Sequence, residues 1–411
     1  MAATFVVVGA NLAGGTAAAT LRAEGFDGRV VLVGEEPAPP YERPPLSKEF
    51  LRGEVPFERA LLRPPGFWEE QGIERRFGAR AVHVDPGARR VVLDDGEAVP
   101  YDKVLVATGL RNRRLPVPGA DLGGVHMLRT VADAESLRAE MLPGRTAVVV
   151  GMGVIGAEVA ASLRMSGLEV DVVEPLPGPV YRAVGPAVAT AIEGIHRDHG
   201  VRMNFGESVE TFEGNGRVER VVTSSGRSLE CDFAVVGVGT IPLTDVLEGT
   251  SVKLANGVVV DEHCRTNVDG VYAAGDVANH YHPTHGRHIR VEHWQNALRQ
   301  GAAAARSMLG GSEPYDEVHW FWSDQYDANI QFAGLAPTVE GSWDDVVIRG
   351  DLGERSFVAF SLQEERIVAA VAVNRGRDVR RSMAMIKARA VVDRVRLADP
   401  DSDVRSAAAA G

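Results

Sequence analysis

Residues 148–158 have the sequence VVVGMGVIGAE, and this stretch decides the fold. Its apolar run ends in Gly151-Met152-Gly153-Val154-Ile155-Gly156, a complete GxGxxG pattern followed by an Ala-rich helical segment. The first glycine permits a tight turn, the second lets the backbone approach a pyrophosphate, and the third lets helix and strand pack closely. The N–H groups that begin the helix then face the phosphates. Strand, turn and helix together predict a dinucleotide-binding βαβ unit rather than a Gly-rich turn without a ligand.

The next apolar run, VDVVE, ends at Glu174. A carboxylate in this place binds the ribose hydroxyls and repels a 2′-phosphate, so NADH is expected as the ligand. Arg182 lies eight residues further on and leaves binding of NADPH open.

A second copy of the pattern lies near the N-terminus, where residues 6–15 read VVVGANLAGG and the following strand ends at Glu35. Asn11 takes the place of the second glycine. Asparagine adopts unusual backbone angles more readily than most residues, although its side chain takes up room beside a pyrophosphate. Two copies in one chain predict an α/β fold that binds two dinucleotides.

Length and composition set the class of the protein. The chain has 411 residues, 45% hydrophobic and 24% charged, which suggests two to three ordinary globular domains. The net charge of -12 argues against a nucleic-acid partner. No apolar stretch approaches about 18 residues, so no membrane partner is expected. The first apolar run lacks a preceding basic region, which favours a strand over a signal peptide and a cytoplasmic location.

The sequence changes in character from about residue 315. Alternating apolar residues at 346–349, 357–362 and 368–373 predict an antiparallel sheet with one solvated face. A helix is expected at 378–388, and the tail 399–411 is expected to be frayed.

Three further motifs are VLVATG at 104–109, YAAGD at 272–276 and YERPPLSK at 41–48. With the two fingerprints they make the chain resemble the two-dinucleotide-domain flavoproteins related to glutathione reductase. Within these it is most similar to the ferredoxin reductases of bacterial oxygenase systems, the putidaredoxin reductase and biphenyl dioxygenase reductase type. The resemblance implies two Rossmann-like domains and a C-terminal α+β domain: FAD-binding residues 1–113 and 246–315, NADH-binding residues 114–245, and an interface domain at 316–411.

The same resemblance implies the site residues. Lys48 and Glu158 would form a polar pair beside the reacting edge of the flavin, and Trp294 would begin a helix that points at it. The FAD site would comprise Gly9, Ala13, Gly14, Glu35, Arg43, Lys48, Ala81, Thr108, Gly109, Arg129, Gly275, Asp276, His293 and Trp294. The NADH site would comprise Gly151, Gly153, Ile155, Gly156, Glu158, Glu174, Arg182 and Gly239.

The aromatic segment at 320–322 has two interpretations. Trp320 and Trp322 would shield the flavin or couple it to the acceptor, or they would form an ordinary aromatic core. Asn11 and Leu243 depart from the family pattern and leave the geometry at the FAD pyrophosphate open.

The positions of the cysteines decide the chemistry. Disulfide reductases and peroxidases of this superfamily need thiols after the first hairpin, where this chain has PPLSKEFLRG at 44–53. The two cysteines, Cys231 and Cys264, are expected to be packed thiols. Electrons would therefore leave singly from the flavin to a small iron–sulfur ferredoxin that serves a monooxygenase or dioxygenase. A rubredoxin- or nitrite-reductase-type enzyme, a thiol-independent NADH oxidase and an NADH-responsive flavoprotein like apoptosis-inducing factor remain alternatives.

Two clusters of basic residues can be interpreted either as functional sites or as ordinary solvated segments. The histidines at 279–293 are expected to lie in a solvated loop, and no metal site is expected. The C-terminal arginines and one lysine form either a docking patch for an acidic ferredoxin or a solvated helix face. These residues are Arg375, Arg377, Arg380, Arg381, Lys387, Arg389, Arg394 and Arg396, with Asp378 and Asp393 the acidic residues in the same span.

Overall fold

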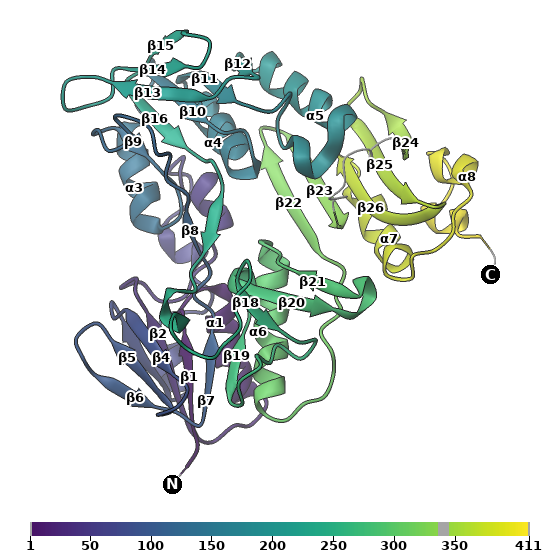
Figure 1. Ribbon diagram of the computed structural model, residues 1–411. Coiled ribbons are helices and arrows are strands. Elements are labelled where there is room, and N and C mark those ends of the chain that lie inside the picture. Colours follow the sequence, from purple (N-terminus) through teal and green to yellow (C-terminus); the bar gives the residue numbers. More distant parts are fainter. Residues whose placement is uncertain (1, 336–344, 410–411) are drawn as a thin grey trace. The chain divides into compact units, whose positions relative to one another are not determined.

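The computed structural model describes residues 2–335 and 345–409, and the chain divides into two compact units (Figure 1). The first unit contains Met1–Glu42, Phe57–Arg111 and Thr240–His319. The second contains Arg43–Pro56, Asn112–Gly239 and Trp320–Gly411. Strands β8 (Leu110–Asn112) and β17 (Thr240–Pro242) stand where the chain passes from one unit to the other.

The first unit is built on a parallel sheet in the order β19-β7-β1-β2-β3. Apolar runs form β1, β2 and β7 because both faces of these strands are buried, whereas the edge strand β3 contains charged residues. Helices α1 (Leu12–Ala23) and α6 (Trp294–Met308) pack together on one face, and the antiparallel sheet β4-β5-β6 packs with its core on the other (Figure 1). The remaining elements are β1 (Thr4–Val8), β2 (Arg29–Gly34), η2 (Phe57–Ala60), α2 (Phe67–Glu70), β3 (Ile73–Phe77), β4 (Ala81–Asp85), β5 (Arg90–Leu93), β6 (Ala98–Pro100), β7 (Lys103–Val106), η3 (Asp245–Leu247), β18 (Val258–Val260), β19 (Val271–Ala273), η4 (Gly275–Val277), β20 (Ala278–His282), η5 (Pro283–His285) and β21 (Arg287–Ile289).

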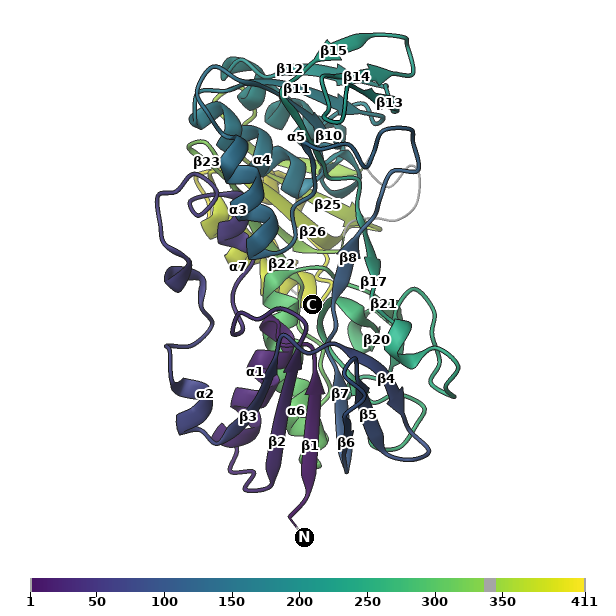
Figure 2. The same ribbon diagram turned by 90° about the vertical axis from the view of Figure 1, so that its left-hand side faces the viewer.

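The second unit repeats this plan with the parallel order β12-β11-β10-β16-β9. Helix α4 (Val154–Met165) packs against β10 and β11 (Figure 2), and the antiparallel sheet β13-β14-β15 packs with the core on the other face. The predicted duplication of the βαβ pattern is therefore confirmed. The other elements of this half are η1 (Pro44–Ser47), β9 (Val125–His126), α3 (Val131–Glu140), β10 (Thr146–Val150), β11 (Glu169–Glu174), α5 (Tyr181–Asp198), β12 (Arg202–Phe205), β13 (Val209–Glu213), β14 (Arg220–Thr223), β15 (Ser228–Glu230) and β16 (Phe233–Val236).

The second unit also contains the antiparallel sheet β22-β23-β26-β25-β24, which confirms the predicted strands. The expectation of one solvated face is wrong. Helix α5 packs on one face, and helix α7 (Gly376–Lys387) contacts β23 and β26, so the interior of β26 is buried. The strands are β22 (Trp320–Gln325), β23 (Ala328–Gly334), β24 (Val346–Asp351), β25 (Ser356–Gln363) and β26 (Arg366–Val373).

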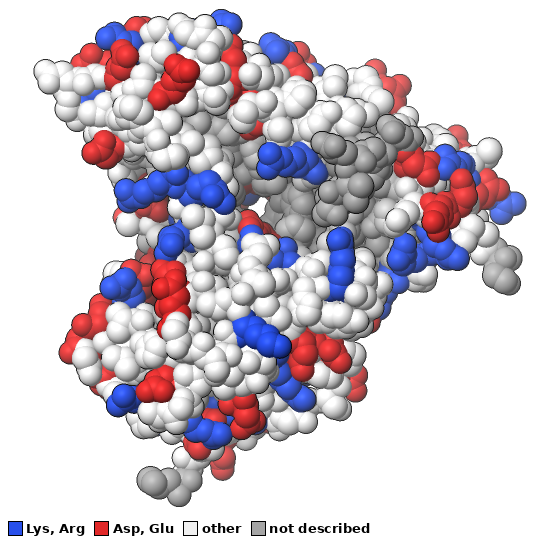
Figure 3. Space-filling model, viewed as in Figure 1, with Lys and Arg blue, Asp and Glu red and all other residues white. Residues whose placement is uncertain are grey.

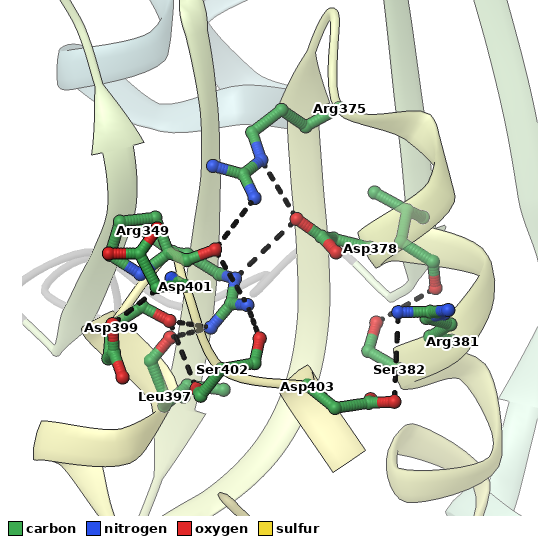
Figure 4. A network of polar contacts seen from close by, with 12 residues as sticks. Arg349, Arg375, Asp378, Arg381, Ser382, Leu397, Asp399, Asp401, Ser402 and Asp403 are labelled. Carbon is green, nitrogen blue, oxygen red and sulfur yellow. Dashed lines mark hydrogen bonds and ion pairs between the residues drawn. The ribbon is translucent and has the colours of Figure 1, made fainter. Parts of the chain in front are cut away.

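The tail is ordered through residue 409, so the expected fraying is wrong for this part of the chain. It follows α8 (Arg394–Ala398) and forms η6 (Val404–Ala407). Arg349, 1% exposed, donates hydrogen bonds to backbone carbonyls of the tail, including those of Leu397 and Ser402, and forms an ion pair with Asp378 at 3.5 Å (Figure 4). One buried guanidinium thus satisfies carbonyls that the tail would otherwise bury without partners.

Of the helices in residues 2–335 and 345–409, none has both the length and the apolar character needed to span a membrane.

Candidate active site

The complete fingerprint forms the turn between β10 and α4. A Cβ on Gly151, at φ +93°, would lie 2.4 Å from the carbonyl oxygen of Gly237, and one on Gly156 would lie 2.0 Å from that of Gly151. Packing within the protein therefore requires both glycines. A Cβ on Gly153 would meet nothing within 4 Å, so this glycine leaves open space at the start of α4. That space and the helix N-terminus fit a pyrophosphate.

Glu174 lies at the end of β11, where the structure brings it to the fingerprint. Its carboxylate is buried and accepts hydrogen bonds from the backbone N–H groups of Met152 at 2.7 Å and Leu176 at 2.9 Å. Arg182, in the first turn of α5, and Ile155, on α4, are exposed. Gly239, at φ +98°, follows β16 and also has open space around its missing Cβ.

We expect Glu174→Arg to lower the ratio of kcat/KM for NADH to that for NADPH at least about tenfold, because it replaces the carboxylate that is predicted to bind the ribose with a cation that attracts a 2′-phosphate. Steady-state kinetics with both nucleotides measures this ratio. Glu169→Arg, the same charge change at the exposed start of β11, is the control. An unchanged ratio in Glu174→Arg would contradict the predicted role.

The first fingerprint, in the other unit, has the same geometry despite Asn11. A Cβ on Gly9, at φ +115°, would lie 2.2 Å from the carbonyl oxygen of Ala107, and one on Gly14 would lie 1.9 Å from that of Gly9. Asn11 precedes α1 with φ -98° and ψ -167°, close to the -69° and -174° of Gly153. The tolerance for unusual angles that we expected to matter is therefore not needed here. The backbone at Asn11 is extended, and the loop fits a second pyrophosphate.

The predicted FAD residues around this loop offer different groups. Glu35 is exposed directly after β2. The Thr108 hydroxyl donates to the carbonyl oxygen of Leu243 at 2.6 Å, and the Leu243 N–H donates to the carbonyl oxygen of Gly109 at 3.0 Å. Leu243 thus acts through its backbone, so its departure from the family pattern has no cost at this contact. The side chain of Ala81 is buried in the core, which leaves its backbone for the cofactor.

Helix α6 and the turn at η4 carry the remaining predicted FAD residues of this unit. The N–H of Gly275, next to Asp276, donates to the Gln300 side chain on α6 at 2.8 Å. His293 precedes α6 and Trp294 begins it. Glu42 is a further candidate residue beside Trp294: burial raises the pKa of its carboxyl, and a hydrogen bond from Trp294 lowers it. Gln300 lies outside the quoted motifs, whereas Glu42 lies inside the motif at 41–48 but was not singled out there.

The expectation that the histidines at 279–293 lie in a solvated loop is wrong. His280 and His282 lie on β20 of a hairpin with β21, and both side chains are buried. Burial lowers the pKa of His280 to about 3 and that of His293 to about 4. Among the described residues no group of three candidate ligands could hold a metal ion.

Lys48 and Glu158 are brought together within the second unit. Lys48 Nζ lies 2.7 Å from Glu158 Oε2, and the two side chains are 8% and 2% exposed. The Ser47 hydroxyl donates to the same oxygen at 2.5 Å, and the Ser323 hydroxyl on β22 donates to Oε1 at 2.7 Å. Ser162 on α4 donates to the carbonyl oxygen of Ser47 at 2.7 Å and fixes the segment that carries Lys48. A buried ion pair with both carboxylate oxygens hydrogen-bonded is held in a fixed geometry.

Ser47 and Ser323 were missed because a single serine carries no sequence signal for such a contact. The predicted FAD residues Arg43 and Arg129 are also in contact, since the Arg43 guanidinium donates to the Arg129 carbonyl oxygen.

Trp320 and Trp322 stack with ring centroids 5.3 Å apart. The core beneath α5 includes the intervening Phe321 and neither indole.

Both cysteines are free and buried, which confirms the expected packed thiols. Burial raises the pKa of Cys231 to about 12 and raises that of Cys264 as well. Thiolate chemistry at neutral pH is thus disfavoured at both residues.

Several C-terminal arginines form ion pairs with carboxylates that lie outside residues 375–396. Arg381 pairs with Asp403 at 3.7 Å, and Arg394 pairs with Glu365 at 2.8 Å and with Asp345. On the face seen in Figure 3, basic and acidic side chains lie among one another. The basic excess inferred from the sequence is therefore reduced by carboxylates from distant segments. Arg377 and Arg380 are exposed on α7.

Comparison with known proteins gives a consistent result. Residues 3–301 match the family described as pyridine nucleotide-disulphide oxidoreductase, and residues 320–408 match the reductase C-terminal family. The chain is 40% identical over 401 residues to the anthranilate 1,2-dioxygenase system ferredoxin–NAD(+) reductase component of Burkholderia cepacia, covering 96% of this chain and 97% of that protein. It matches the structure of a ferredoxin reductase for the CYP199A2 system from Rhodopseudomonas palustris with TM-score 0.94 and 38% identity, covering 99% and 100%. It matches the covalent putidaredoxin reductase–putidaredoxin complex with TM-score 0.94 and 33% identity, covering 98% and 97%.

Proposed function

The chain belongs to the pyridine nucleotide-disulphide oxidoreductase family, and from this premise we propose that it is a ferredoxin reductase that takes electrons from NADH. It binds FAD and NAD(H). Its electrons pass singly to a small iron–sulfur ferredoxin that serves a monooxygenase or dioxygenase. The observation that carries the proposal is the buried ion pair between Lys48 and Glu158. Glu158 lies on α4, which follows the NADH fingerprint, and Lys48 lies in the segment 44–53, which contains no cysteine.

FAD supplies the chemistry that accepts a hydride and releases electrons one at a time. The protein would position the two cofactors and polarise their surroundings. The N-termini of α1 and α4 would bind the two pyrophosphates, with Gly9, Ala13 and Gly14 at the first. Glu35 and Glu174 would bind the riboses. Lys48 and Glu158 would form the polar pair beside the flavin, and their burial keeps water away from the pair.

The other predicted residues complete this proposal. FAD would also be held by Arg43, Arg129, Asp276 and the start of α6 at His293 and Trp294, and Trp320 and Trp322 would shield it. Residues 1–113 with 246–315 form the FAD domain, residues 114–245 the NADH domain, and residues 316–411 the interface domain. We place the reaction in the cytoplasm.

The deciding experiment is the visible spectrum of the purified protein before and after one equivalent of NADH without oxygen. Flavin bands that bleach on addition of NADH support the proposal. A colourless protein that does not take up added FAD would contradict it. Turnover with ferredoxin, compared with rubredoxin as acceptor, then separates the proposal from a rubredoxin-reductase function.

We propose further that the ferredoxin is acidic and docks near α7. Reversing Arg377 and Arg380 to glutamate should lower kcat/KM for the ferredoxin about tenfold at low salt, because opposite charges accelerate encounter. Reduction of ferricyanide should be unchanged. Reversing Arg89 and Arg90, which are exposed in the other unit, is the control. Equal losses with both acceptors would remove the docking argument.

A further inference from the structure

A chain of hydrogen bonds runs from Glu158 through strand β22 into helix α5. Ser323 Oγ, which bonds Glu158, lies 3.0 Å from Gln325 Nε2. Gln325 Oε1 lies 2.8 Å from His196 Nε2 on α5, and His196 Nδ1 lies 3.3 Å from the Tyr326 hydroxyl. The side chains of Ser323, Gln325 and His196 are buried to 2% exposure or less. Water therefore cannot replace these contacts.

The donors in this chain all point toward Glu158. The Gln325 amide donates to Ser323, so the Ser323 hydrogen is available for the Glu158 carboxylate. The carbonyl end of Gln325 then accepts from His196 Nε2, and the unprotonated Nδ1 accepts from Tyr326. Each donor polarises the next, so such a chain strengthens the bond at its charged end.

This order of donors and acceptors requires that His196 is neutral, because its Nδ1 accepts a hydrogen bond. Burial lowers the pKa of His196 to about 4, so its ring carries a single proton at neutral pH. His199 directly follows α5 and stacks on Tyr326 with ring centroids 3.6 Å apart. The charged group that contacts Glu158 is Lys48, with the Ser47 hydroxyl on the same oxygen.

We propose that Ser323 is a positioning residue for Glu158, supported by Gln325 and His196. The Oε2 atom is held by Lys48 and Ser47, and the Oε1 atom depends on Ser323. Strand β22 and helix α5 thereby fix the orientation of the carboxylate. This inference deepens the proposed function and rests on it for the role of Glu158.

The test compares Ser323→Ala with Ser323→Thr, which retains the hydroxyl, and with Ser361→Ala, a buried serine on β25 of the same sheet. Loss of one hydrogen bond to a carboxylate favours its protonated form. The acid limb of kcat/KM for NADH with ferricyanide should therefore move up by about one pH unit in Ser323→Ala. The pH titration of the visible absorption of the FAD-loaded protein, without NADH, should move in the same direction. Ser323→Thr and Ser361→Ala should match the parent protein.

A second variant covers the case in which Ser323→Ala fails to fold. Gln325→Met removes the donor to Ser323 at similar volume and should move both pH dependences in the same direction by a smaller amount. FAD content and the thermal unfolding midpoint are measured for every variant. Unmoved pH dependences in folded, FAD-loaded Ser323→Ala, or in Gln325→Met if that alone folds, would overturn the inference. A parent protein that binds FAD but is not reduced by NADH would instead overturn the proposed function, and the absorption titration would still test Ser323.

Discussion

We expect Lys48→Met to lower kcat/KM for NADH about a hundredfold with ferricyanide as acceptor. The Lys48 ammonium is the cation bonded to the Glu158 carboxylate, and both groups are almost fully buried. Methionine keeps the length of the side chain but removes the charge. Preorganised charges in a buried site commonly contribute factors of about 100 to 1000 in rate.

The design of this experiment separates catalysis from folding. Lys48→Met alone leaves a buried carboxylate without its cation, which costs roughly 3–5 kcal/mol of unfolding free energy. The double variant Lys48→Met with Glu158→Gln removes both charges, so it should recover stability without recovering activity. Lys253→Met, an exposed lysine, is the control for loss of charge. Full activity in a folded, FAD-loaded Lys48→Met would remove the pair from the proposed mechanism.

The second large effect is on stability, and it concerns Arg349. We expect Arg349→Met to lower the free energy of unfolding by roughly 4 kcal/mol, because it removes a buried cation from Asp378 and leaves tail carbonyls unsatisfied. Urea denaturation measures the change, and limited proteolysis should cut the tail after Leu397 faster in the variant.

A surface arginine of the same region provides the comparison. Arg396, whose side chain is 66% exposed, pairs with Asp393 at 3.8 Å. Arg396→Met should change stability by less than about 1 kcal/mol, since exposed ion pairs contribute little. Similar effects of the two substitutions would show that the Arg349 network does not hold the tail.

Much of the fold could be predicted because its evidence is local. A fingerprint consists of neighbouring residues, and its strand, turn and helix form within about thirty positions. The resemblance to ferredoxin reductases, and with it FAD and NADH, rested on several such local motifs, and the comparisons confirmed it. The individual site residues remain predictions, although the structure places Glu174 against the fingerprint and Lys48 against Glu158.

The errors came from contacts between distant segments. Alternation in β25 and β26 suggested a solvated face, but α5 lies about 170 residues earlier in the sequence and covers it. The histidines at 279–293 looked like a polar loop, yet β20 and its neighbours bury two of them.

The sequence by itself determined the two nucleotide folds, the choice of cofactors and the lack of a redox thiol after the first hairpin, because each depends on the identity of residues close together in the chain. Only the tertiary structure decided which serines hold Glu158, which carboxylates neutralise the C-terminal arginines and what orders the tail. These features depend on contacts between residues that are far apart in the sequence, such as Ser323 and Glu158, which are 165 positions apart. Because the contacting groups are buried, they must form hydrogen bonds with one another.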